Sequence, residues 1–517
     1  MSLVNWTKIK EQSPVASEDT VFSGRTTLYT DYEKATADNI IDIIDEQFMD
    51  IYQNYIDIKM LKNYEKGLQP IWHREKEVRS DINNKVVINH AHEFKEFKKG
   101  FIYAQPITYV QRAKKDIADR DELIDDGAIA ELNEMCHEQG KTSIDLEIAD
   151  EFCTCGLGYK FAKSNTNEDD VSAFEIYSLP SEYTFIIYRN DIYRSKFLAG
   201  TFVIRNDGTV VLGCYSDELY FELEGSYGLS GWVLKKVEKN GIGMIPIVEY
   251  KYDNQKRSCF EPVIPILNEL NNVESDRVNG VSQFVQSLLW LNNCKMSETE
   301  YQQLLDLGCV QTDDVSETKK ASIQYLTAEL NQTSTQTLVD DLHARALQIV
   351  GAPDRDQSTG GNTGQAIMLS GGWTTAETQA QSCEDIFKKS EKEFIKLLLK
   401  IINNSKKASE NLKTLKPSDI DIEFGRNRTD NLLTKTQGLQ NMLEAGLHPR
   451  LAFECCGLFA DVEQAYIDSI PYLKKWAVED TEPEKIEENV FDNTPEPTKN
   501  IVVDPETGTQ SLKGEEE

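Results

Sequence analysis

The segment EPVIPILNELNNVESDRVNGVSQFVQSLLWL, residues 261–291, carries the clearest structural signal in the chain. Its apolar side chains recur at three- and four-residue intervals, as on one face of an α-helix. They are Ile264, Leu267, Leu270, Val273, Val278, Val281, Val285 and Leu288. A helix of about 30 residues is about 45 Å long, and a polar waist, NNVESDR, interrupts this stripe. We expect so thin a stripe to pack against neighbours in an assembly, although a long helix in a monomeric bundle would show the same pattern.

A second helix is expected from about Thr335. Its apolar stripe consists of Leu338, Leu342, Ala346 and Ile349. The helix ends at GAPD, residues 351–354, because Gly351 and Pro353 favour termination. The residues between the two helices, 292–334, form a less periodic module of mixed character.

The loop DRDQSTGGNTGQAIM, residues 354–368, is rich in Gly, Ser and Thr and suggests a phosphate cradle. A Walker A loop requires a lysine and a hydroxyl residue after its last glycine and a strand before it. Here Gly364 is followed by Gln365 and Ala366, and a helix precedes the loop. We therefore interpret it as a polar loop that joins two helices and can move or touch a partner without gripping it.

Beyond this loop we expect a long helix over 364–403, bent or loosened by the two glycines before Trp373. Residues 417–425 alternate as a strand does, and 431–476 have the pattern of two or three helices. The acidic, proline-containing tail, 477–517, is expected to be disordered.

The N-terminal half mixes helices and strands. We expect a loosely ordered arm over 1–35, an amphipathic helix over 39–64 and a short strand at NNKVVIN, residues 83–89. A helix over 91–99 should point its two phenylalanines inward and end at Gly100, before the extended segment FIYAQPITYV.

A further helix is expected over 130–150, and 172–252 reads as antiparallel hairpins that end in an edge strand after Pro246. Gly156 and Gly158 suggest a dinucleotide loop, but the third glycine and the following helix are missing. The fold class is therefore α+β.

The chain of 517 residues carries 55 Lys and Arg against 87 Asp and Glu, a formal net charge of −32. Such a surface offers no basic footprint for wrapping nucleic acid. Its apolar segments are too short to span a bilayer, so we expect a soluble protein without membrane contact. The absence of a signal peptide favours reduced thiols in a cytoplasmic protein.

The sequence contains no recognisable catalytic motif, which predicts that the protein is not an enzyme. Cys153 and Cys155 lack a second pair at zinc spacing, so no metal site is predicted. His90 and His92 are interpreted as solvated or core histidines, and no cofactor is expected.

Several segments, in order, resemble the portal proteins of tailed double-stranded-DNA bacteriophages of the siphophage type. YIDIKMLKNYEKGLQPI followed by NNKVVINHAHEFKEFKKGFIYAQPITY is similar to the family's N-terminal motif, with Phe101 in a tyrosine position and Ala104 in a glycine position. The other segments are GMIPIVEYKYDN, the segment at 261–291, IQYLTAELN, LHARALQIVGAPDRD, GGNTGQAIM and DIDIEFGRNRTDN. Together they cover most of residues 50–475.

The resemblance implies a mostly helical, ring-forming portal fold with a wing, a two-helix stem, a clip and a crown. By position, it assigns 1–258 and 367–430 to the wing, 259–291 and 335–352 to the stem helices, 292–334 to the clip, 353–366 to a tunnel loop, 431–476 to the crown and 477–517 to the tail.

The resemblance also implies a function. Portals are rings, usually of twelve subunits, at one vertex of the capsid in the virion, assembled in the host cytoplasm. DNA passes non-specifically through the channel during packaging and ejection. The partners implied are further copies of the chain, the terminase large subunit, a head-completion or adaptor protein, and the major capsid and scaffold proteins. A soluble enzyme with a helical appendage and another ring-forming virion component are the alternatives.

Carried over by position, the tunnel loop would face DNA. Its residues are Asp354, Arg355, Asp356, Gln357, Ser358, Thr359, Gly360, Gly361, Asn362, Thr363 and Gly364. Because DNA must slide, we expect a mainly acidic or neutral channel with sparse basic rings, for which Arg345 and Arg355 are candidates. Each of these arginines is also interpretable as an intersubunit or solvent-facing charge.

Overall fold

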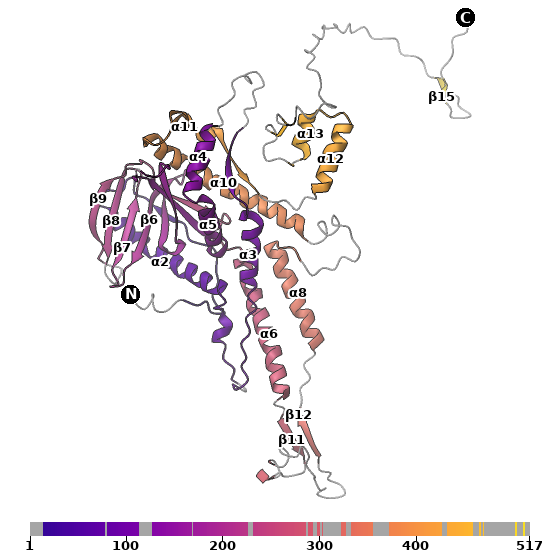
Figure 1. Ribbon diagram of the computed structural model, residues 1–517. Helices are drawn as coiled ribbons and strands as arrows, with labels where there is room; N and C mark the ends of the chain where they lie inside the picture. Colours follow the sequence, from indigo (N-terminus) through magenta and orange to yellow (C-terminus); the bar gives the residue numbers. More distant parts are fainter. Residues whose placement is uncertain are drawn as a thin grey trace, which may run out of the picture. The chain divides into compact units, whose positions relative to one another are not determined.

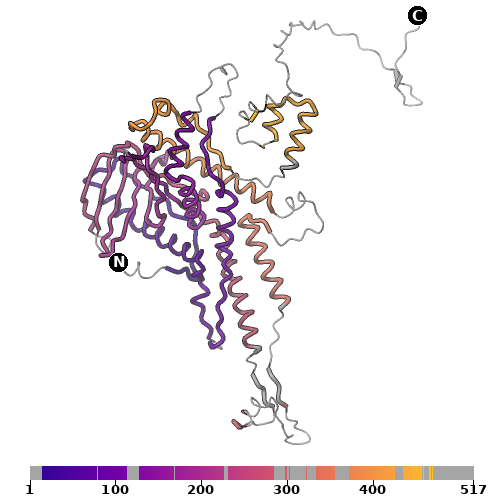
Figure 2. The backbone as a smooth tube through the Cα atoms, in the orientation of Figure 1, coloured from indigo at the N-terminus to yellow at the C-terminus, as the bar shows by residue number. Residues whose placement is uncertain are grey.

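A computed structural model of the chain is shown in Figures 1 and 2. The structure describes residues 14–77, 80–112, 127–167, 169–225, 231–285, 288–292, 297–299, 302, 322–326, 332–354, 372–425, 432–456, 458, 465–466, 469, 502–503 and 510–511. The chain divides into two compact units, Met1–Thr429 and Asp430–Glu517. The larger unit contains helices and both parallel and antiparallel strand pairs, which confirms the α+β class.

A six-stranded sheet with the order β1-β5-β6-β7-β8-β9 forms one part of the larger unit. Its strands are β1 (Leu28–Thr30), β5 (Thr184–Arg189), β6 (Lys196–Ile204), β7 (Val210–Tyr215), β8 (Leu219–Gly225) and β9 (Val233–Lys239). Strands β5 to β9 pair antiparallel, as the hairpin pattern predicts, whereas β1 pairs in parallel with β5. Helix α2 (Ile40–Glu65) buries Ile44, Phe48 and Tyr55 in one core with Ile187 and Phe202 of the sheet. The helix expected over 39–64 is confirmed.

A three-stranded antiparallel sheet with the order β10-β3-β4 forms the second layer. Its strands are β3 (Leu157–Ser164), β4 (Phe174–Leu179) and β10 (Ile247–Lys251), and β10 is the edge strand expected after Pro246. Helices α5 (Lys141–Cys155) and α10 (Trp373–Asn404) pack against this sheet. Their contact is aromatic: the rings of Phe152 and Phe387 lie with centroids 6.3 Å apart, and Tyr103 packs against both.

Gly156 ends α5 with a φ of +86°, and a Cβ there would lie 2.1 Å from the carbonyl oxygen of Lys256. Only glycine fits this close approach of two backbones. The position thus has a packing role, consistent with the rejection of a dinucleotide loop.

Two further strands, β2 (Ile107–Gln111) and β13 (Ile420–Phe424), pair antiparallel. This confirms the strand expected within 417–425. The remaining helices of the larger unit's main body are α3 (His90–Tyr103), α4 (Gly127–Glu138) and α11 (Glu410–Thr414), and the short turns are η1 (Pro70–His73), η2 (Ser181–Tyr183), η3 (Glu261–Val263) and η4 (Pro417–Asp419).

Helix α6 (Ile264–Val285) is followed by strand β11 (Leu288–Asn292), and strand β12 (Ser322–Leu326) precedes helix α8 (Gln332–Val350). The strands pair antiparallel, with Leu288 opposite Leu326, and the helices contact each other. The chain therefore leaves along α6 and returns along α8, so that the two helices form an antiparallel pair next to the antiparallel strand pair β11–β12 (Figure 1).

The smaller unit contains α12 (Leu432–Glu444) and α13 (Pro449–Cys456), which pack together around Leu443, Ala452 and Phe453. Helices were expected here within 431–476, and the described residues confirm two of them. In the tail, β14 (Val502–Val503) and β15 (Gln510–Ser511) pair with each other; the rest of the expected disordered segment lies outside the described residues.

Several helix boundaries differ from the sequence-based expectations. Helix α3 continues through Gly100, because the next turn buries Ile102 and Tyr103 and this burial outweighs the roughly 1 kcal/mol propensity cost of glycine. The single helix expected over 130–150 is two helices, α4 and α5, separated by Gly140 in the left-handed region.

The first long helix was expected to include Leu288, but it ends at Val285 and Leu288–Asn292 is β11. The second expected helix is α8, which begins at Gln332. It buries Ala346, Leu347 and Val350, whereas Leu338 and Ile349 of the expected stripe are exposed. The third begins at Trp373, directly after Gly372 at a φ of +79°, and residues 364–371 lie outside the described residues.

Candidate functional site

Polar side chains in and just after the polar waist of α6 bond to a segment of the N-terminal region. The backbone N–H of Asn84 donates to Asn279 Oδ1 at 2.7 Å, that of Val86 to Ser275 Oγ at 2.9 Å and that of Ile88 to Asn271 Oδ1 at 2.8 Å. The three α6 side chains belong to residues that are at most 3% exposed.

The spacing of these three hydrogen bonds follows from the geometry of an extended chain beside a helix. Alternate residues of an extended chain are about 6.6 Å apart, and helix positions four apart are about 6.0 Å apart. Asn271, Ser275 and Asn279 therefore match Ile88, Val86 and Asn84 in reverse order. NNKVVIN was expected to be a strand, but the structure assigns no strand to these residues; side chains of α6 instead accept from three of their backbone N–H groups.

The two ends of the candidate loop meet at one lysine of α3. Lys98 Nζ donates to the carbonyl oxygen of Gly351, which ends α8, at 3.3 Å and to Oε1 of Gln379 on α10 at 2.6 Å. Lys98 is 1% exposed, and burial lowers the pKa of its ammonium group. Helix α3 is thus bonded to the chain both before and after residues 355–371.

Aromatic packing also attaches α10 to α3. The indole of Trp373, the first residue of α10, lies 6.4 Å from the ring of Phe97 and 6.1 Å from that of Phe101, measured between centroids. Phe97 was expected to point inward like Phe94; only Phe94 is fully buried, and Phe97 instead forms the half-buried platform for the tryptophan. Trp373 therefore anchors α10 to α3 within the same chain.

A buried ionic cluster fixes α10 several turns further along the helix. Glu391 of α10 accepts from Lys160 Nζ at 2.8 Å and from Tyr109 Oη at 2.7 Å, and its Oε1 lies 3.0 Å from Lys141 Nζ. Asp145 pairs with both lysines. Burial acts to raise the pKa of Glu391, but the charges of Lys141 and Lys160 outweigh it and hold the pKa well below its usual range.

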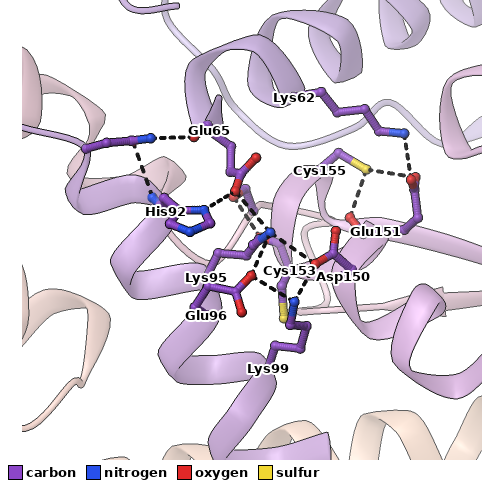
Figure 3. A network of polar contacts seen from close by, with 12 residues as sticks. Lys62, Glu65, His92, Lys95, Glu96, Lys99, Asp150, Glu151, Cys153 and Cys155 are labelled. Carbon is purple, nitrogen blue, oxygen red and sulfur yellow. Dashed lines mark hydrogen bonds and ion pairs between the residues drawn. The ribbon is translucent and has the colours of Figure 1, made fainter. Parts of the chain in front are cut away.

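A second network joins α2, α3 and α5 (Figure 3). Lys95 Nζ lies 3.0 Å from carboxylate oxygens of Glu65, Glu96 and Asp150. His92 Nδ1 lies 2.6 Å from Glu65 Oε1 and Lys99 Nζ lies 2.9 Å from Asp150. Burial acts to lower the pKa of Lys95, and its hydrogen bonds to the carboxylates outweigh this and raise it. Helix α3 is therefore bonded to α2 and α5 as well as to the residues that flank the candidate loop.

The predicted site residues are only partly described. Arg345, on α8, is exposed and forms an ion pair with Asp341 at 2.8 Å, and Asp354 is half-buried just after α8. Arg355 and the positions from Asp356 to Gly364 lie outside the described residues. Sequence reasoning missed Lys98 and Gln379, for which no local pattern exists.

The cysteine pair proposed and rejected as a metal site is buried in α5. Burial raises the pKa of Cys155 to about 12 and that of Cys153 well above its ordinary value. Both thiols are therefore protonated at neutral pH, which disfavours metal ligation. Among the described residues, no helix is both long and apolar enough to cross a membrane.

These features define an α+β protein in which a multi-sheet body is bonded to an antiparallel helix pair followed by an antiparallel strand pair. A family model described as Phage portal protein, SPP1 Gp6-like, matches residues 28–464, which is most of the chain. The chain therefore belongs to this family of phage portal proteins, virion components with roles in genome packaging and head-tail connection. Among curated proteins no match was found.

Proposed function

We propose that this chain assembles into a closed ring, usually of twelve subunits, that forms the channel for DNA at one vertex of the phage capsid. In this assignment α6 and α8 are the two stem helices, the β11–β12 strand pair belongs to the clip, and residues 353–366 are the tunnel loop. The clip would dock the terminase large subunit and afterwards the head-completion or adaptor protein. The major capsid and scaffold proteins would contact the rest of the ring as it assembles in the host cytoplasm.

The observation that carries this proposal is the apolar surface on the helix pair. Val278 and Val281 of α6 are 39% and 55% exposed, and Leu338 and Ile349 of α8 are 46% and 51% exposed. The inward side of the pair is already filled by Ala346, Leu347 and Val350. Four large apolar side chains on two adjacent helices are suited to burial against the same helices of neighbouring subunits.

The charge of the helix pair fits a channel in which DNA slides. Residues 264–285 and 332–350 contain five acidic residues and two arginines. Arg277 pairs with Glu274 at 2.7 Å and Arg345 pairs with Asp341 at 2.8 Å, so both cations are satisfied on their own helices. Twelve copies at −32 each give a formal charge near −380. Strong phosphate neutralisation, which would slow translocation, is therefore avoided.

The proposal assigns no catalysis to this chain. Portal proteins as a family are structural, and the ATP-driven work of packaging would belong to the terminase.

Negative-stain microscopy and native mass spectrometry of the purified chain test ring formation directly. We expect closed rings with an axial hole. Val281→Glu should block ring closure by placing a charge in the subunit interface, and the matched control Val203→Glu, at a 62% exposed position of β6, should leave rings intact. A parent chain that remains monomeric or forms only open filaments contradicts the proposal.

The tunnel-loop assignment has a separate test. Deletion of residues 358–363 should leave ring assembly unchanged, because these residues lie between the anchored ends at Gly351 and Gln379. DNA packaging measured with terminase and procapsids should fall. Unchanged packaging by intact rings would remove the assignment of this loop while leaving the portal role standing.

A further inference from the structure

Two helices that are far apart in the sequence bring two imidazoles and a carboxylate together. His90 is the first residue of α3, Glu93 lies one turn later, and His343 is on α8. The rings of His90 and His343 are stacked with centroids 4.4 Å apart, and His90 Nδ1 lies 2.9 Å from Glu93 Oε2. One ligand atom of each of the three residues lies within 4.8 Å of the others.

The frame that holds these side chains is fixed at a second point. Lys98 of α3 bonds to Gly351 at the end of α8, and these residues follow His90 and His343 by eight positions each. Eight residues of helix correspond to about 12 Å. The two helices therefore run side by side in the same direction here, and the three side chains project from regular, packed elements.

We propose that His90, Glu93 and His343 bind one divalent transition-metal ion of the zinc type. Two imidazoles with one carboxylate are a ligand set that zinc uses in proteins when a fourth position is left to water. Imidazole nitrogens disfavour Mg²⁺ and Ca²⁺, which prefer oxygen ligands. The carboxylate of Glu93 also offsets the unfavourable interaction of a cation with the N-terminus of α3.

The geometry requires only side-chain rotation. With zinc–nitrogen bonds of about 2.0 Å, ligand atoms around a tetrahedral ion are roughly 3.3 Å apart. Rotation about χ2 of a histidine is a soft motion, and the ligand atoms already lie within 4.8 Å of one another, so a small rotation brings them towards the spacing that the ion requires. The Glu93 side chain is 43% exposed and the His90 side chain 16% exposed, so an ion can reach the ligands from solvent.

The bound ion would cross-link the first turn of α3 to α8. Together with the Lys98 bond to Gly351, this gives two fixed points between a helix of the main body and a helix of the antiparallel pair. This inference does not depend on ring formation, because all three ligands come from one chain.

The test is a calorimetric titration of the full-length, EDTA-treated chain with Zn²⁺. Thiols also bind zinc, so the parent for this experiment carries Cys294→Ser, Cys309→Ser and Cys455→Ser; Cys455 is exposed, and the other two lie outside the described residues. We expect one tight zinc ion per chain and no comparable heat with Mg²⁺.

Ligand variants locate the site. His343→Ala and His90→Ala should each weaken zinc binding by at least about 100-fold, since even outer-shell changes cost up to that much. The matched control is His92→Ala, on the same helix turn, whose imidazole bonds to Glu65 instead. Hydrogen exchange should show zinc-dependent protection of the first turn of α3 and of α8 around His343, which a site elsewhere would not produce.

The proposal is overturned if the parent binds no zinc, if Mg²⁺ binds equally well, or if His343→Ala binds zinc as tightly as the parent. Circular dichroism in EDTA shows whether each variant is folded. Should both histidine variants fail to fold, Glu93→Gln decides, because its half-exposed side chain tolerates an amide of the same size. Parent-like zinc affinity in that variant contradicts the carboxylate's role as a ligand.

Discussion

Replacement of Glu391 by glutamine should destabilise the larger unit severely while changing hardly any volume. Glu391 is fully buried between Lys141 and Lys160, and Tyr109 and Tyr250 donate their hydroxyl protons to it. With Asp145, the cluster contains two positive and two negative charges. Glu391→Gln leaves two buried ammonium groups with a single carboxylate.

The magnitude follows from burial. Breaking a buried ion pair by removing one partner costs about 3–5 kcal/mol, because an uncompensated charge remains in a low-dielectric interior. Native domains are stable by only about 5–15 kcal/mol, so the loss is a large fraction of the total. Glu393→Gln is the control: two residues further along α10, Glu393 pairs with Lys196 at 2.6 Å but is 34% exposed. Partly exposed pairs contribute at most about 1 kcal/mol.

Urea unfolding followed by circular dichroism measures both variants. We expect a much lower unfolding midpoint for Glu391→Gln than for Glu393→Gln. Adding Lys160→Met to Glu391→Gln should recover most of the loss, because it restores charge balance with an apolar side chain of similar length. Equal midpoints for the two single variants would refute the reasoning that burial, and not merely ion pairing, sets the cost.

Three further predictions concern the pH dependence of stability, the glycine at position 351 and the hydrogen bonds between α6 and residues 84–88. Burial acts to raise the pKa of Glu249, but the charges of Lys256 and Lys251 outweigh burial and lower the pKa to about 2. The pKa of Glu391 is lowered as well, so the stability that both carboxylates contribute should be complete above about pH 4.5 and be lost as the pH falls towards 2. A melting temperature that stays constant over this range would contradict the prediction. Gly351 has a φ of +66°, and a Cβ there would lie 2.3 Å from the Gln379 side chain; Gly140 has a φ of +64°, and a Cβ there would meet no atom within 4 Å. The left-handed backbone costs either alanine variant about 1–2 kcal/mol, so Gly351→Ala should lower the melting temperature more than Gly140→Ala does. Ser275→Ala should cost about 1 kcal/mol and speed hydrogen exchange at Val86. Ser282→Ala is the control and should leave that amide protected, because the Ser282 hydroxyl accepts from the Asn84 side chain and Val86 donates to Ser275.

Elements with an apolar periodicity of their own were predictable from the sequence. Helix α2 buries Ile43, Phe48 and Tyr55 on the face that its apolar periodicity predicts, and α8 ends where Gly351 and Pro353 predict. The antiparallel hairpins between β5 and β9 follow from alternation and turn residues. In each case a few neighbouring residues contain the whole signal.

The contacts that the sequence did not predict are those in which the two partners lie far apart along the chain. The polar waist of α6 was interpreted as an interruption, yet Asn271, Ser275 and Asn279 are spaced by four and satisfy the backbone of residues 84–88. A strip of small polar side chains at helical spacing was the available signal. No sequence pattern indicated a role for His343, because its ring stacks on His90 only when α3 and α8 lie together in the fold.

The described residues on either side of the candidate tunnel loop are both bonded to α3. Lys98 bonds to Gly351 before the loop and to Gln379 after it, while Phe97 and Phe101 hold Trp373. Directional bonds to a buried ammonium group tolerate less displacement than apolar contacts do, because an unsatisfied charge there is costly. A shift of α8 must therefore either move α3 and α10 with it or break the Lys98 bonds. Since α3 is itself fixed to α2 and α5 by the carboxylates around Lys95, the anchors before and after the candidate loop are both tied to the sheet-containing body.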